Sequence, residues 1–203
     1  QIEYAKIAAV ALDVSNGTTD TELRFDIRHA GSVNRAFLLT PTEVVINDGS
    51  FDTDFRFETN SNTHGLFVDA GNGRVGILNS SPSTALDVTG TLLADKAYIA
   101  ESTLTDGATV TWDMSTQSVC KLTLGGNRTI SAPTNGSTGQ FASILVIQDG
   151  TGSRSLTWNA AYEFASDTAP TLTTTASLGD LFTFRYNGTK WLEVGRNQAL
   201  TLS

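Results

Sequence analysis

The sequence predicts an all-β chain, because its composition, its hydrophobic periodicity and its turn residues all favour strands. Hydrophobic residues make up 39% and charged residues 17%, and Thr, Ser, Asn and 18 Gly supply much of the remainder. This mixture suits strands joined by tight turns better than it suits helices. Apolar and polar residues alternate, as around Leu23, Phe25 and Ile27, with the period of a half-buried strand.

Turn residues separate these alternating segments at intervals of about ten residues, which is typical of a β-meander. The segment DAGNG at 69–73 is an example, because Asn, Asp and Gly accept positive φ angles. Two Ala-rich segments are the weak helical candidates. We expect a strand at 4–11, which has no capping residue before it, and either a short helix or an extended linker at 92–103.

A change of composition near residue 100 predicts two domains, a shaft-like β-hairpin region at 1–103 and a second domain at 104–203. The strands of the first region are short, and each hairpin has few large apolar side chains to bury. A small domain of this kind is marginal alone, so we expect other copies of the chain to supply the missing burial. The residues expected in this intersubunit core are Phe55, Phe57, Phe67, Val75 and Ile77.

The second domain has longer apolar runs, and we expect a β-sandwich with a jelly-roll-like arrangement. The run 141–147 predicts a central strand that is buried on both faces. Asn187 and Gly188 predict a hairpin with a type I′ turn. The residues expected in the core of the sandwich are Ile144, Val146, Leu156, Phe182 and Phe184.

Residues 54–94 resemble a segment of the tail fibres of tailed bacteriophages, in which a hairpin with a RVGIGTxxPxxxLDVxGT-like sequence recurs along the shaft. Leu78 and Asn79 depart from the usual Gly-Thr of that pattern. Residues 4–47 are similar to the shaft module that precedes it, and residues 105–196 are similar to a knob-like module of virion surface proteins. The residues that match the shaft pattern are Arg74, Val75, Gly76, Ile77, Ser81, Pro82, Leu86, Asp87, Val88, Gly90 and Thr91.

The resemblance implies a homotrimer with an intertwined, prism-like shaft, made in the host cytoplasm and built into the tail fibre of the virion. Its implied partners are other tail and fibre proteins and a glycan or protein of the host cell surface. The chain begins at Gln1 inside a patterned segment, so we expect a piece of a longer fibre.

The sequence suggests no cofactor, metal ion or catalytic group. His29 and His64 lie in expected turns, and no His or Cys cluster has zinc spacing. The acidic stretches at 69–73 and 148–153 lack the ligand pattern of an EF-hand and are predicted to be hairpin turns. Cys120 is expected to be a buried, inert thiol on a strand. Paired carboxylates that cleave glycans stay open, because their separation is spatial.

The charge and the hydropathy exclude two classes of partner. A net charge of −8 opposes binding to nucleic acid, because that affinity depends on Lys and Arg that neutralise phosphates. No run approaches the roughly 20 apolar residues of a membrane helix, so membrane insertion is not expected.

Aromatic residues could form a platform for sugars, but alternation of Trp112 with Val110 and of Trp158 with Leu156 favours a role in the core. The residues concerned are Trp112, Trp158, Trp191, Tyr162 and Tyr186.

We therefore expect a non-enzymatic, structural fibre protein that attaches to the host. The alternatives are a capsid decoration or head spike protein, a tailspike that cleaves glycans, and a cellular adhesin. Host contact is expected at loops at the tips of the knob, at 131–139 and 164–172. The candidate binding residues in them are Asn135, Ser137, Thr138, Ser166, Asp167 and Thr168.

Overall fold

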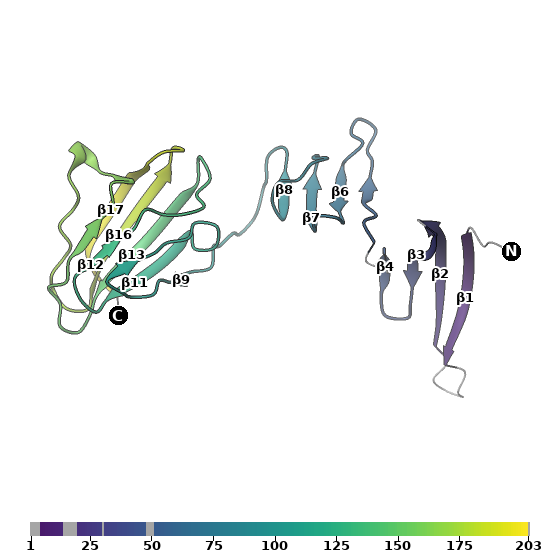
Figure 1. Cartoon of the computed structure of the whole chain (residues 1–203), viewed down its shortest axis with the longest axis horizontal. Helices are drawn as coiled ribbons and strands as arrows, with labels where there is room; N and C mark the ends of the chain where they lie inside the picture. The colour runs from purple at the N-terminus through teal and green to yellow at the C-terminus, as the bar shows by residue number, and fades with distance from the viewer. Residues whose placement is uncertain (1–4, 14–19, 30, 48–50, 203) are drawn as a thin grey trace. The chain divides into compact units, whose positions relative to one another are not determined.

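A computed structural model describes residues 5–13, 20–29, 31–47 and 51–202 (Figure 1). These residues form strands, turns and one short 3-10 helix, with no α-helix among them, which confirms the all-β class. Contacts within the chain define two compact units, Gln1–Asp95 and Lys96–Ser203. The boundary predicted at residue 103 stays a prediction.

The first sheet of the N-terminal unit is an antiparallel meander of four strands in chain order. It confirms the strand expected at 4–11 over its described residues. Residues opposite one another in a ladder share a face, so Ile7, Phe25 and Phe37 lie together on one side. The other side carries ion pairs between Arg24 and Glu22 and between Arg35 and Asp26. The strands are β1 (Ala5–Asp13), β2 (Asp20–His29), β3 (Ser32–Leu39) and β4 (Val44–Ile46).

The second sheet of this unit also has four strands in chain order, and only its last pair is parallel. The turn at 69–73 joins β6 to β7 as the predicted hairpin. The strands are β5 (Phe55–Phe57), β6 (Leu66–Asp69), β7 (Arg74–Ile77) and β8 (Leu86–Val88).

The two faces of this second sheet differ sharply. The register places an unbroken set of apolar side chains on one face. Phe57 is 62% exposed there, and its neighbours are at most half-buried. Phe67, predicted with four of these residues for an intersubunit core, instead lies on the opposite face and is buried within the chain itself. We call the set the shaft face, and its residues are Phe55, Phe57, Leu66, Val68, Val75, Ile77, Leu86 and Val88.

The Ala-rich segment after the second sheet is an extended linker rather than a helix. Residues 91–101 are exposed throughout. Leu93 is 94% exposed and Tyr98 91% exposed, although both are large apolar side chains.

In the C-terminal unit, successive strands alternate between two sheets. β9, β11 and β13 pair in parallel in a six-stranded sheet, and β10, β12 and β14 pair in parallel in a three-stranded sheet. The antiparallel hairpin of β16 and β17 completes the larger sheet (Figure 1). The strands are β9 (Ser102–Thr103), β10 (Thr109–Val110), β11 (Val119–Leu124), β12 (Arg128–Ile130), β13 (Phe141–Gln148), β14 (Leu156–Trp158), β15 (Tyr162–Glu163), β16 (Leu178–Tyr186) and β17 (Trp191–Thr201).

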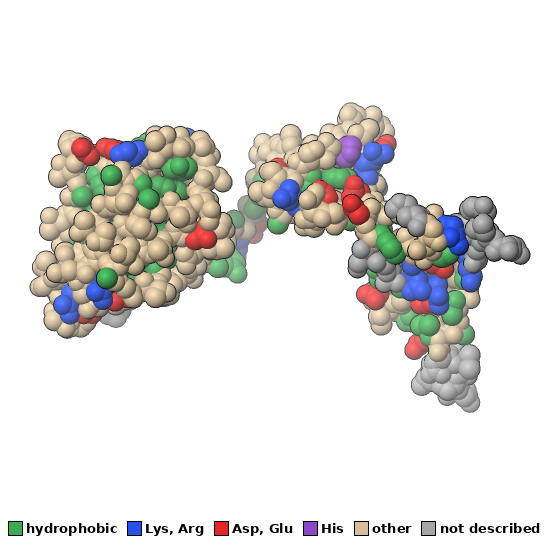
Figure 2. Space-filling view, in the orientation of Figure 1, with side chains coloured by type: hydrophobic (Ala, Val, Ile, Leu, Met, Phe, Trp, Pro, Cys, Tyr) green, Lys and Arg blue, Asp and Glu red, His purple; other side chains and the backbone are tan. Residues whose placement is uncertain are grey.

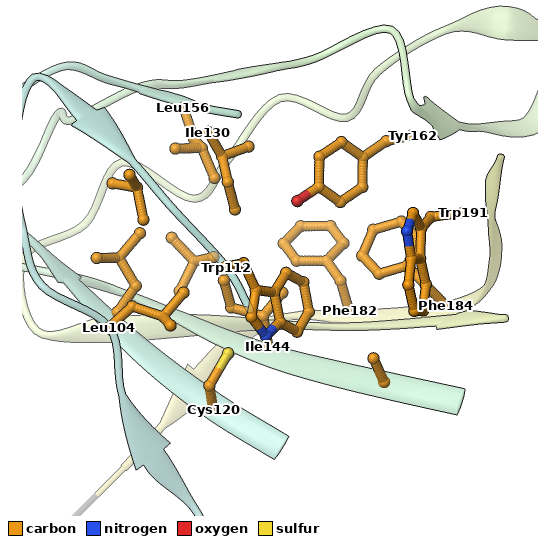
Figure 3. Close-up of a cluster of buried hydrophobic side chains, with 14 of the residues drawn as sticks. Leu104, Trp112, Cys120, Ile130, Ile144, Leu156, Tyr162, Phe182, Phe184 and Trp191 are labelled. Carbon is orange, nitrogen blue, oxygen red and sulfur yellow. The ribbon is translucent and has the colours of Figure 1, made fainter. Parts of the chain in front are cut away.

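The core of this unit lies between the two sheets, as a sandwich requires (Figure 3). Val110, Ile130 and Leu156 come from the smaller sheet, and Leu122 and Ile144 come from the larger one. Every residue predicted for this core is buried, which confirms Ile144, Val146, Leu156, Phe182 and Phe184.

The topology nevertheless differs from a jelly-roll. A jelly-roll consists of antiparallel Greek keys, whereas here the chain crosses to the opposite sheet after nearly every strand and returns in parallel. The predicted hairpin turn at 148–153 is wrong for this reason, because it leads from β13 in one sheet to β14 in the other. Alternating apolar residues look the same in parallel and antiparallel pairs, so the sequence did not distinguish these arrangements.

Two further details of the prediction are corrected. β13 lies between two other strands as predicted, but only one of its faces is buried, and Phe141 on the other face is 56% exposed. The β16–β17 hairpin exists, but its turn is not type I′, because φ is positive at Gly188 and not at Asn187.

Candidate binding surface

The first predicted loop borders the turn between β16 and β17, and the second predicted loop follows the segment that borders this turn on its other side. Gly139 donates its backbone N–H to the carbonyl of Tyr186 at 2.8 Å, which joins the first loop to the start of this turn. On the other side, the Lys190 Nζ donates to the carbonyl of Ala160 at 2.7 Å and lies 3.2 Å from the Glu163 carboxylate. The structure therefore places the first loop and residues 160–163, from which the second loop continues, beside residues 187–190. We call residues 131–139, 164–168 and 187–190 the loop surface.

The loop at 131–139 is held in place by Asn135. This residue has a positive φ of 57°, and its side-chain amide donates to the Asp113 carboxylate at 3.0 Å. That hydrogen bond, followed by those from Ser115, holds the pKa of Asp113 below its usual value. Ser137 and Thr138 are exposed beyond this anchor. Asn135 thus shapes the loop, whereas Ser137 and Thr138 present free hydroxyl groups.

The second loop begins with the 3-10 turn η1 (Ala165–Asp167). Ser166 and Asp167 have φ angles of 57° and 52°, in the left-handed region that residues other than Gly rarely adopt. The Asp167 N–H donates to the carbonyl of Phe164 at 3.0 Å, and the Thr168 hydroxyl donates to the carbonyl of Ser166. These bonds fold the turn so that all three candidate residues in it are exposed.

The turn at 187–190 is the part of this surface that sequence reasoning missed. The Asn187 side chain accepts the backbone N–H groups of Thr189 and Lys190 at 2.8 and 2.7 Å, which fixes the turn. The YNGTKW pattern predicted a hairpin, but no signal in the sequence placed it beside the loop at 131–139, which ends 48 residues earlier.

The aromatic residues pack in the core or against it, beneath the loop surface, and do not form an exposed platform for sugars. Trp112, Trp191 and Tyr162 are buried in the core, as predicted (Figure 3). Trp158 packs against this core. Tyr186 stacks on Trp191, with ring centroids 4.8 Å apart. The side chains that face solvent here are short and polar, and the visible face of this unit shows few charged groups (Figure 2).

The described residues contain no group of His, Cys, Asp and Glu that could hold a metal ion. His64 lies in a turn, as predicted, while His29 ends strand β2. Cys120 is buried on β11, and burial followed by the charge of Glu101 raises the pKa of its thiol to about 12. A thiol of this kind stays protonated and unreactive at neutral pH. None of the helices in the described part of the chain has the length and apolar character of a membrane span.

Comparison with known proteins gives one family. No curated protein and no solved structure matches the chain. Residues 105–191 match the family model described as "Putative phage tail fibre C-terminal domain". A domain of this family implies a structural role in the virion and a location in its tail. The resemblance to bacteriophage tail fibres is thereby confirmed over residues 105–191, which are similar to the C-terminal domain of those fibres.

Proposed function

We propose that this chain is a homotrimeric segment of a phage tail fibre and that its C-terminal unit attaches the virion to the host surface. The observation that carries the first part is the shaft face, which leaves one side of a four-stranded sheet apolar and incompletely covered. The family match supports the second part, because it falls on the unit that carries the loop surface.

A single-layer sheet with one apolar face needs a second layer to bury that face. The first sheet repeats the pattern, with Ile7 71% exposed and Val44 59% exposed on its apolar side. Other copies of the same chain can supply this second layer, because they are always present in a fixed ratio. Three copies that turn their apolar faces toward a common axis would form a prism, and the exposed Leu93 and Tyr98 of the linker would join the same core.

Host contact is assigned to the loop surface. Ser137, Thr138, Ser166 and Thr168 present hydroxyl groups, which suit hydrogen bonds to a surface glycan or protein. Small polar surfaces bind modestly, so several linked copies would be needed for firm attachment, with a gain of about 10²–10⁴ through effective concentration. We assign no catalysis to the chain, and other tail proteins are its expected partners within the virion.

Sedimentation of two neighbouring variants tests the assembly. Phe57→Ser removes an apolar side chain from the shaft face, whereas Arg56→Ser alters the opposite face of the same strand, where Arg56 is also exposed. We expect the wild type and Arg56→Ser to sediment as trimers and Phe57→Ser to dissociate at lower protein concentration. A folded wild-type monomer at micromolar concentration would contradict the proposal.

Adsorption to host cells tests attachment. Replacing Ser137, Thr138 and Ser166 together by Ala should reduce adsorption and leave the melting temperature unchanged, because these side chains are exposed. Thr168 is kept, since its hydroxyl group holds the 3-10 turn. Asn135 is kept, since it anchors its loop. Unchanged adsorption would move host contact elsewhere, and release of reducing ends from host polysaccharide by the purified chain would overturn the non-enzymatic assignment.

A further inference from the structure

A cleft opens beside the loop surface where β15 separates from β17. β15 pairs with only the first two residues of β17, Trp191 and Leu192, before the chain turns away into η1. The cleft has a volume of about 380 Å³, within the range of small-molecule sites. Phe164 and Ala165 form one wall, and Glu193, Gly195 and Arg196 form the other.

Two charged side chains of β17 lie on the core side of the sheet: Glu193 by alternation along the strand, and Arg196 because a β-bulge shifts the register after Glu193. Glu193 pairs with Phe184 and Arg196 pairs with Phe182, with a shift of register between them. Opposite residues share a face, so the two charges lie on the same side as two completely buried phenylalanines. Bulges of this kind re-aim side chains, often beside functional sites.

The ion pair between these residues is incompletely satisfied. The Arg196 guanidinium lies 2.7 Å from one oxygen of Glu193 and stands over the ring of Phe164. The Glu193 side chain is only 7% exposed, and its Oε1 is buried without a hydrogen-bond partner among the described residues. A desolvated carboxylate oxygen of this kind favours the arrival of a hydrogen-bond donor.

Stability does not explain this arrangement. Two apolar side chains at 193 and 196 would continue the core, and replacing a buried ion pair by apolar residues is commonly neutral or stabilising. The cleft instead offers a hydrogen-bond acceptor on Glu193, a donor on Arg196 and the ring of Phe164 close to one another. The Glu193–Arg196 pair carries no net charge. A neutral ligand with adjacent hydroxyl groups matches this set, because each hydroxyl both donates and accepts.

We propose that this cleft binds one neutral sugar unit of a host-surface glycan. A sugar hydroxyl donates to Glu193 Oε1, a neighbouring hydroxyl accepts from Arg196, and the Arg196 side chain shifts along Phe164 to admit them. The inference rests on the proposed attachment function and names the ligand class and a site next to the loop surface.

Saturation-transfer NMR with single neutral sugars, namely hexoses, deoxyhexoses and N-acetylhexosamines, tests the proposal on the full chain. Glu193→Gln keeps the shape of the side chain but places an N–H donor where an acceptor is needed. Ala165→Leu leaves the ion pair intact and enlarges an exposed side chain that lines the cleft. The matched control is Glu101→Gln, whose carboxylate pairs with Lys121 beside β9, at the opposite edge of the same sheet.

We expect at least one sugar to receive saturation from the wild type and the control, with about tenfold weaker binding to Glu193→Gln. Binding to Ala165→Leu, which is the variant to rely on if Glu193→Gln folds poorly, should be lost. Equal binding by all four proteins, or none by the wild type, would overturn the inference. So would binding of an extended peptide in place of any sugar. Host-cell adsorption of the wild type, measured in parallel, reports on the attachment function separately.

Discussion

The buried carboxylate of Asp180 accepts the backbone N–H of Thr173 at 2.7 Å and, through its other oxygen, that of Ala199 at 3.0 Å. Asp180 is only 2% exposed. It therefore ties the segment after the second loop and the end of β17 to β16, and it satisfies backbone groups that the sheet ladders leave unpaired.

Asp180→Asn should destabilise the C-terminal unit. The side chain of Asn has one acceptor oxygen and one NH2 donor, so one of the two backbone N–H groups would face a donor. We expect the free energy of unfolding to fall by about 3 kcal/mol. Thermal unfolding measures this loss. A change within about 0.5 kcal/mol, as for ordinary surface substitutions, would show that the two backbone contacts add little.

Val146→Asp should unfold the same unit. Val146 is 2% exposed and lies directly opposite Asp180, so the new carboxylate would be unpaired and would face a like charge. The expected loss is several kcal/mol. Ser143→Asp, on the other face of the same strand, is the control and should melt close to the wild type. Normal expression and melting of Val146→Asp would refute the assigned orientation of β13.

Cys120 should resist thiol reagents in the folded chain. With a pKa of about 12, only about one thiol in ten thousand is ionised at pH 8, and burial blocks access as well. Labelling with a chromogenic disulfide should be slow in buffer and complete in denaturant. Rapid labelling of the native chain would mean that β11 opens readily.

The stability of the C-terminal unit should fall at acid pH partly through Asp149. Hydrogen bonds from Arg154, then from the backbone of Gly152 and Thr151, hold the pKa of this carboxyl below its usual value. The pKa of Asp149 is lower in the folded chain than in the unfolded chain, where it is 3.8. The ionised carboxylate therefore stabilises the fold above pH 3.8, and this stabilisation is lost as the pH falls through the folded pKa.

Asp149→Asn should accordingly melt below the wild type near neutral pH, and this difference should shrink between about pH 5 and pH 2. Asp167→Asn, at an exposed position of η1, is the control. A difference between wild type and Asp149→Asn that is constant over this range would contradict the role of the Asp149 carboxylate.

The sequence by itself determined the strand class, the β1 strand, the hairpin at 69–73 and the buried residues of the sandwich, such as Ile144 and Phe184. These features depend on alternation, turn residues and side-chain volume, which are local properties of the chain. The tertiary structure alone decided which strands pair. Register between distant segments decided the parallel pairing of β11 with β13, the placement of Phe67 opposite the shaft face, and the position of the loop at 131–139 beside residues 187–190. The same was true of Arg196: a bulge of one extra residue at Val194 turns it to the same side as Glu193, and period-two alternation carries no trace of this shift.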